Sequence, residues 1–134
     1  MRRLLSILSV LVCVPVISAC ATSTSTSKFH GAEHSVAQTI ANLQTDATGG
    51  EEKKLCENDF AASVVNKLGG RSGCEKALKS QLSEIDSTEV TVEAVHVSGT
   101  TATATVKSVF TGKKKNSTAT LVLEGGKWKI SSLS

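Results

Sequence analysis

Aromatic side chains are scarce in this sequence: 134 residues include three phenylalanines, one tryptophan and no tyrosine. A core needs most of these rings, so an aromatic-lined ligand pocket is not expected. Basic residues interleaved with aromatics, which are typical of nucleic-acid-binding surfaces, are also missing. No Cys-x-x-Cys occurs, which disfavours a redox or metal-binding cysteine pair. The composition therefore argues against several chemistries before any motif is considered.

The N-terminus has the pattern of a signal peptide. Arg2 and Arg3 precede an apolar run over residues 4–17 that is too short to span a bilayer as a mature helix. The run ends in Ile-Ser-Ala-Cys, residues 17–20, which resembles the lipobox of bacterial lipoproteins. The resemblance implies removal of residues 1–19, a diacylglycerol thioether on Cys20, and a fatty acid such as palmitate on the freed amine.

These modifications predict that the protein is attached to a membrane, and on which side of it. Two or three acyl chains on Cys20 give stable anchoring, where a single chain gives only marginal binding. We expect a lipid-anchored protein on the extracytoplasmic face of the cell membrane, within the cell envelope. An ordinary cleaved signal that leaves Cys20 free is the alternative. Loss of Arg2 and Arg3 lowers the formal net charge from +3 to +1, so no nucleic-acid partner is implied.

The remaining cysteines predict a disulfide. Cys13 lies in the removed segment and Cys20 carries lipid, which leaves Cys56 and Cys74 in an oxidising compartment. Closing a loop of this length contributes roughly 3 kcal/mol to stability. A redox or metal-binding role for this pair is the disfavoured alternative.

The mature chain divides into a tether and one domain. Residues 20–29 comprise the lipidated cysteine and a Thr/Ser-rich tether, of which residues 21–28 reach at most ~26–29 Å when extended. Residues 30–134 have the size of a single domain, with a helical half followed by a strand half. This order predicts the α+β class.

Apolar spacing predicts three helices. The first covers residues 32–45 and the second residues 51–68. A capping box, Ser72-x-x-Glu75, opens a third helix, with Leu78, Leu82 and Ile85 facing inward. If the disulfide forms, the second and third helices are not a simple antiparallel hairpin.

Period-two patterns predict four strands, at residues 89–97, 100–110, 117–123 and 127–133. In the first strand the apolar residues change from one side of the alternation to the other, which predicts a bulge near Glu93. Gly125-Gly126 predicts a two-residue hairpin turn. Short connections predict an antiparallel meander, with a polar, basic loop at residues 111–116. The inward positions include Ala102, Ala104, Ala119, Leu121 and Leu123, and we favour close helix packing over a hollow at the alanines.

This plan, with the closing hairpin Gly125-Gly126-Lys127-Trp128-Lys129-Ile130, resembles the nuclear transport factor two-like, or cystatin-like, cone fold. Small actinobacterial lipoproteins often share it, including a cysteine pair in the helical half. The resemblance implies N-terminal helices packed on a curved antiparallel sheet of about four strands. We expect Trp128 to cover one end of the core rather than to stack on a ligand. The superfamily includes isomerases, dehydratases, polyketide cyclases and non-catalytic modules, so the fold does not decide the function.

The residues of such an enzyme are hard to find. Enzymes of the superfamily generally place an acid or base, and often tyrosines, in the cone pocket. The aspartates, Asp46, Asp59 and Asp86, fall outside the inward face of the predicted strands, and Glu93 lies beside the bulge. No nucleophile–base pair is evident. We therefore predict a non-enzyme with no catalytic or cofactor-binding residues and no cofactor.

Two further motifs have weak functional interpretations. His30-Gly31-Ala32-Glu33-His34 reproduces the His-x-x-Glu-His pattern of a zinc hydrolase class, but it falls at the junction of tether and helix, so we predict no metal site there. His96 is expected at a rim or in a hydrogen bond.

Residues 113–115 are three lysines, and such a run predicts a solvated turn. The alternative is contact with anionic headgroups or wall polymers.

The sequence thus predicts a membrane-anchored, non-catalytic module that binds a protein partner or a small apolar ligand. One alternative is a pocket enzyme of the isomerase, dehydratase or cyclase type. Another is an envelope structural factor that contacts anionic polymers. A cavity with an inward carboxylate would favour the enzyme, and an exposed apolar patch would favour the protein partner.

Overall fold

The computed structural model describes residues 24–83, 88–110 and 112–134, so the predicted signal peptide and Cys20 lie outside the described residues. Helices come first and strands second, which confirms the α+β class. None of the helices in the described ranges is both long and apolar enough to cross a membrane. The helical elements are α1 (Gly31–Thr48), α2 (Glu52–Lys54), the π-helix η1 (Leu55–Asp59), α3 (Ala62–Lys67) and α4 (Gly70–Leu82).

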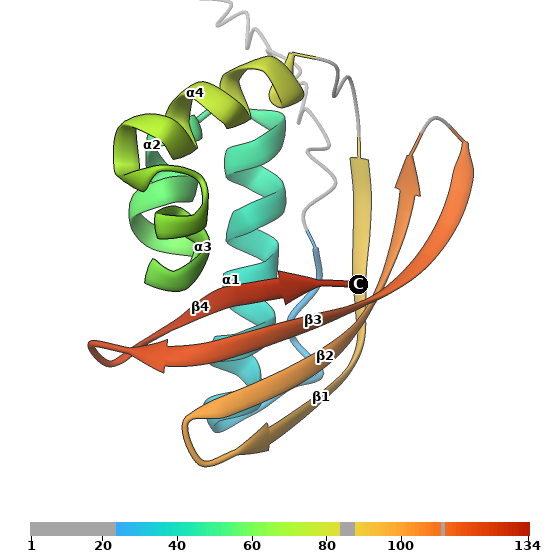
Figure 1. The fold of residues 1–134 in the computed structure, drawn as a ribbon. Coiled ribbons are helices and arrows are strands. Elements are labelled where there is room, and N and C mark those ends of the chain that lie inside the picture. The colour runs from blue at the N-terminus through green and yellow to red at the C-terminus, as the bar shows by residue number, and fades with distance from the viewer. Residues whose placement is uncertain (1–23, 84–87, 111) are drawn as a thin grey trace, which may run out of the picture.

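The strands form one antiparallel meander, as predicted, in the order β1-β2-β3-β4. They are β1 (Thr88–Ser98), β2 (Thr101–Phe110), β3 (Lys113–Glu124) and β4 (Lys127–Leu133). Figure 1 shows α1 lying across the strands, with α2, α3 and α4 gathered beside α1. The sheet and α1 together enclose the larger of two hydrophobic clusters.

Two predicted details of the sheet are confirmed. The pairing of β1 with β2 shifts register between Val92 and Ala94, so Glu93 is the bulged residue. The bulge keeps the valines on both sides of it against the core, because it corrects the alternation of side chains. Gly125 and Gly126 have φ values of +56° and +77° and form the two-residue turn between β3 and β4.

The main core forms where α1 packs closely against the small residues of the sheet. Ala104 and Ala119 face each other across β2 and β3, and both are at most 1% exposed. Small side chains let the helix approach the sheet closely, as predicted for these positions. The other members include Val36, Ala37, Ile40, Val92, Ala102, Leu121, Trp128 and Ile130.

The predicted single helix over residues 51–68 is wrong. Phe60 is extended, with φ −89° and ψ 142°, and separates η1 from α3. It forms a parallel bridge with Ile130, and the amide of Ala61 donates a hydrogen bond of 2.8 Å to the carbonyl of Ile130. The helical pattern is therefore overridden by pairing with β4, a contact between residues distant in the sequence.

The second cluster surrounds the predicted disulfide, which joins Cys56 and Cys74 with 6.1 Å between their Cα atoms. Leu55 and Leu78 pack with these two cysteines. The predicted capping box is wrong, because α4 begins at Gly70 and contains Ser72. Gly73 explains the early start: a Cβ at this position would lie 2.0 Å from the carbonyl oxygen of Leu68, so only glycine permits so tight a connection.

The predicted basic loop at residues 111–116 is also wrong. β2 and β3 stay paired up to Phe110 and Lys113, and residues 113–115 therefore belong to β3. Gly112, with φ +76°, lies in the short connection that makes this possible. Leu123, predicted to face the core, is 38% exposed, because its pair with Trp128 lies at the end of the sheet beside the hairpin turn.

The segment before α1 lies against the domain. Phe29 is 8% exposed and belongs to the main core. The Lys28 ammonium donates a hydrogen bond of 2.8 Å to the carbonyl of Glu93 in β1. Contacts with the domain therefore extend back from the predicted boundary at residue 30 to Thr24, because burial of the Phe29 ring fixes the segment in place.

Candidate functional site

A cavity of about 420 Å³ lies between the C-terminal half of α1 and the sheet. We call it the apolar cavity. Its volume falls within the ~300–1,000 Å³ range of small-molecule sites. Its walls are mainly aliphatic, and it is lined by Ile40, Leu43, Gln44, Ala47, Thr48, Val90, Val106, Ser108, Lys115, Ser117 and Leu133.

The strand register explains why the cavity opens here. On the inward face of β2 and β3, the pair Ala104–Ala119 is covered by α1, and the next inward pair is Val106–Ser117. The pair after that is Ser108–Lys115. Both of these outer pairs line the cavity. The same sheet face is thus packed at the alanines and hollow beyond them, although the sequence pattern predicts no cavity there.

The polar groups of the apolar cavity lie at its edges. Gln44 is 8% exposed, and its side-chain oxygen accepts a hydrogen bond from the Thr24 hydroxyl. Lys115 is exposed and is the sole charged residue of the described lining. None of the described lining residues carries a carboxylate. This arrangement suits an apolar molecule, and the described lining offers it no carboxyl group as acid or base.

A second cavity, of about 580 Å³, lies between α1, η1 and the β3–β4 hairpin. We call it the polar cavity. Its lining combines amides, hydroxyls, two carboxylates and one indole: His34, Ser35, Gln38, Thr39, Asn42, Asp46, Asn58, Asp59, Gly126, Lys127 and Trp128. Asp59 is 3% exposed, and its Oδ2 atom has no hydrogen-bond partner in the part of the chain that the structure describes.

Asp59 is the most perturbed ionisable group of the described residues. The pKa of Asp59 is raised to about 7, mainly because the carboxyl group is buried. The negative charge of Asp46 and a hydrogen bond with the Asp46 side chain raise it further, and the positive charge of Lys129 lowers it. A carboxyl group that titrates near neutrality can transfer protons. Local sequence patterns do not reveal this pair, because they predict a regular helix around Asp59, whereas η1 turns the side chain inward.

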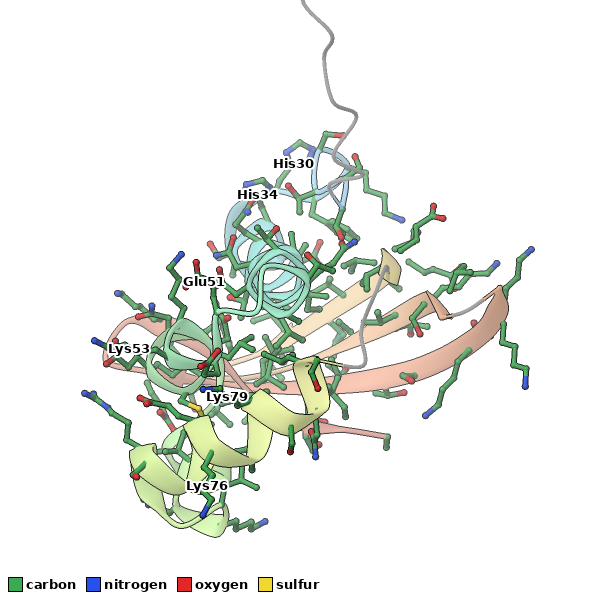
Figure 2. All side chains as sticks on the ribbon, turned by 90° about the horizontal axis from the view of Figure 1, so that it is seen from above. His30, His34, Glu51, Lys53, Lys76 and Lys79 are labelled. Carbon is green, nitrogen blue, oxygen red and sulfur yellow. A yellow bond between two sulfur atoms is a disulfide. The ribbon has the colours of Figure 1, made fainter. Side chains whose placement is uncertain are left out.

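The other residues considered in the sequence do not assemble into a site. His30 and His34 are exposed at the start of α1, and Figure 2 shows them close together, far from Lys76 and Lys79 of α4. The ring of His34 contacts the carbonyl of Thr26 at 3.2 Å. In the described ranges, no three His, Cys, Asp or Glu side chains gather in a group suited to a metal.

Two of the candidates on strands, Glu93 and His96, lie apart from both cavities. The side chains of Glu93 and His96 are exposed on β1, and neither residue lines a cavity described above. Trp128 is 8% exposed and covers one end of the main core, as predicted, although it also borders the polar cavity. Of the three lysines at residues 113–115, only Lys115 reaches the apolar cavity.

Comparison with solved structures identifies the architecture. An NTF-2 like protein of unknown function from Silicibacter pomeroyi matches with a TM-score of 0.54 and 16% identity, over 74% of this chain and 89% of that one. This chain has an NTF2-like cone fold. An uncharacterized cystatin-fold protein from Novosphingobium aromaticivorans matches with a TM-score of 0.51 and 8% identity, over 72% of this chain and 95% of its own length.

At these identities the likeness extends to the fold alone. No protein-family model matches the sequence, and no curated protein matches it. The features of this chain that bear on its function are therefore the two cavities and the N-terminal segment.

Proposed function

We propose that this chain is a lipid-anchored module on the extracytoplasmic face of a bacterial membrane that binds a small apolar molecule without transforming it. The observation that carries the binding role is the apolar cavity, which has aliphatic walls and no described carboxylate. The lipobox at residues 17–20 supports the anchor. The cone fold is compatible with either a binding or a catalytic role.

The rim of the cavity suggests the type of ligand. Lys115 is exposed at its edge, while the interior walls are formed by side chains such as Ile40, Val90 and Val106. An elongated apolar molecule with an anionic end would place its apolar part inside and its charge near this ammonium. A fatty-acid analogue is therefore the appropriate probe.

The binding test uses the full chain with Cys20→Ser, so that no attached lipid competes, and a dansyl-labelled fatty acid whose fluorescence rises in apolar surroundings. Ser117→Phe projects a ring into the cavity from β3. We expect this change to weaken probe binding by at least about tenfold, which corresponds to 1.4 kcal/mol. The matched control is Thr118→Phe, at an exposed neighbouring position on the opposite face. Equal binding by all three proteins, or none by Cys20→Ser, would refute the ligand class.

The anchor has its own test. Membrane fractionation should find the native protein in the membrane fraction, released only by detergent. Cys20→Ser should be soluble or retained as uncleaved precursor. A mature Cys20→Ser protein that still needs detergent for extraction would contradict the lipid anchor.

A pocket enzyme is the second candidate, and the Asp46–Asp59 pair favours it. Two neighbouring carboxyl groups, one with a pKa near 7, are able to exchange a proton with a bound molecule. Complementation of a deletion strain separates the candidates. Loss of function in Asp59→Asn at normal protein abundance supports the enzyme, whereas retained function supports the binding module.

A further inference from the structure

The segment that leads to the predicted lipid site lies against the wall of the apolar cavity. The hydroxyl of Thr24 donates to the side-chain oxygen of Gln44 and, at 3.0 Å, contacts the carbonyl of Val90. Both Gln44 and Val90 line the apolar cavity. Thr24 therefore lies at the edge of the cavity, between α1 and the outer strand β1.

The contacts also give the direction of this segment. Phe29 is buried in the core, and the carbonyl of Thr26 contacts the ring of His34 in the first turn of α1. Thr24, two residues earlier, contacts Gln44 in the C-terminal half of the same helix. Followed toward the N-terminus, the described chain thus runs along α1 toward the end where Ala47 and Thr48 line the cavity.

Cys20 is within reach of the cavity. It precedes Thr24 by four positions, which span at most ~14 Å of extended chain. An acyl chain is long, flexible and apolar, and each methylene group that it buries contributes about 0.8 kcal/mol. Covalent attachment gives it an effective concentration of about the millimolar range, so it has an advantage over free lipids.

We propose that one acyl chain attached to Cys20 folds back and occupies the apolar cavity of its own molecule. This inference rests on the lipid anchor proposed above and names the resident ligand of the cavity. The other acyl chains hold the protein in the bilayer. An apolar ligand that enters the cavity would displace the resident chain into the membrane, and anchoring would become stronger, because membrane binding increases with the number of inserted chains.

The test places a photoreactive group on the acyl chain itself. Cells are supplied with a fatty acid that carries a diazirine near its tail, and the lipidated full-length protein is irradiated in native membranes. Mass spectrometry then identifies the residues joined to the acyl chain. We expect crosslinks within the same molecule to cavity-lining residues of α1 between Ile40 and Thr48, and of β1 or β2.

Variants establish whether the cavity is responsible. Ser117→Phe from β3 and Ala47→Leu from α1 fill the cavity from opposite sides. Either should lower the intramolecular crosslinks at least about fivefold, while Thr118→Phe should leave them unchanged. Use of both walls guards against misfolding of one variant, and the intact disulfide in each is checked by mass spectrometry.

The outcomes separate this inference from the proposed function. Crosslinks confined to membrane lipids or other proteins overturn self-occupancy, yet they leave fatty-acid binding by Cys20→Ser intact. Crosslinks that persist in both filled variants also overturn it. Absence of any acyl group on Cys20 overturns the anchor and this inference together.

Discussion

The strand half and the helical half of this chain reach stability by different means. In the strand half, regular alternation places a continuous row of small and aliphatic side chains against α1, and the core contains Ala104, Ala119 and Leu121 at no more than 1% exposure. In the helical half after α1, α2 and α3 contribute no buried residue. The second hydrophobic cluster there consists mainly of Leu55, Leu78 and the cystine. The covalent bond thus takes the place of packing where the apolar area is small.

The contrast extends to the two cavities. The apolar cavity lies between the C-terminal half of α1 and the regular sheet, beyond the Ala104–Ala119 pair, and its position follows the strand register. The Asp46–Asp59 pair lies where the irregular π-helix meets α1. Regular packing thus borders the apolar cavity, and irregular backbone provides the unusual titrating group. The following experiments test this division.

The largest effect is expected in the strand half, from Trp128→Ala. The ring of Trp128 is 8% exposed within the main core, and its removal should lower the free energy of unfolding by about 3–5 kcal/mol. Urea denaturation measures this change. Leu123→Ala, on the paired strand but 38% exposed, serves as the control with a much smaller loss. Similar losses for both would show that the end of the sheet is not packed as described.

The helical half should respond most to loss of its disulfide. Replacement of Cys56 and Cys74 by alanine should lower stability by roughly 3 kcal/mol, since the closed loop no longer restricts the unfolded chain. Hydrogen exchange should increase first in α3 and α4, while β2 and β3 keep their protection. Uniform loss of protection in both halves would contradict their separate modes of stabilisation.

The raised pKa of Asp59 predicts that the folded protein becomes less stable as pH rises. Its pKa in the folded state is raised to about 7, above the unfolded value of about 3.9, so the folded state binds the proton more tightly. This contribution is fully present below about pH 4 and is lost as pH rises through about 7, with a slope of at most about 1.4 kcal/mol per pH unit.

Asp59→Asn should remove this slope and be more stable than the native chain at pH 8. Denaturation curves at several pH values between 4 and 8 measure the difference between the two proteins. Glu89→Gln, an exposed carboxylate on β1, is the matched control and should retain the native slope. A difference between Asp59→Asn and the native chain that does not change with pH would rule out a raised pKa.

The smallest effects belong to the exposed face of β1. Glu93→Ala and His96→Ala should each change stability by no more than about 0.5–1 kcal/mol, because both side chains are exposed. Lys28 donates its hydrogen bond to the backbone carbonyl of residue Glu93, and this bond is therefore kept when the side chain is removed. Thermal unfolding and complementation of a deletion strain measure the outcome. Loss of function in Glu93→Ala at normal abundance would point to a role for this carboxylate.

Local sequence determined the elements whose structure depends on neighbouring residues. Alternation of side chains predicted β4 with its observed ends and placed the bulge at Glu93, and Gly125-Gly126 specified its turn. The count of cysteines predicted the pairing of Cys56 with Cys74. These features follow from period, turn conformation and residue count, which a sequence displays directly.

Only the tertiary structure decided the features that depend on contacts between distant residues. Pairing of Phe60 with Ile130 interrupted the expected second helix, and η1 brought Asp59 beside Asp46. The cavity beyond Ala104 and Ala119 depends on how the C-terminal half of α1 lies over the sheet, which no local pattern records. The physical reason is that backbone pairing and burial between distant segments outweigh local helix propensity, which is worth only about 1 kcal/mol or less per residue.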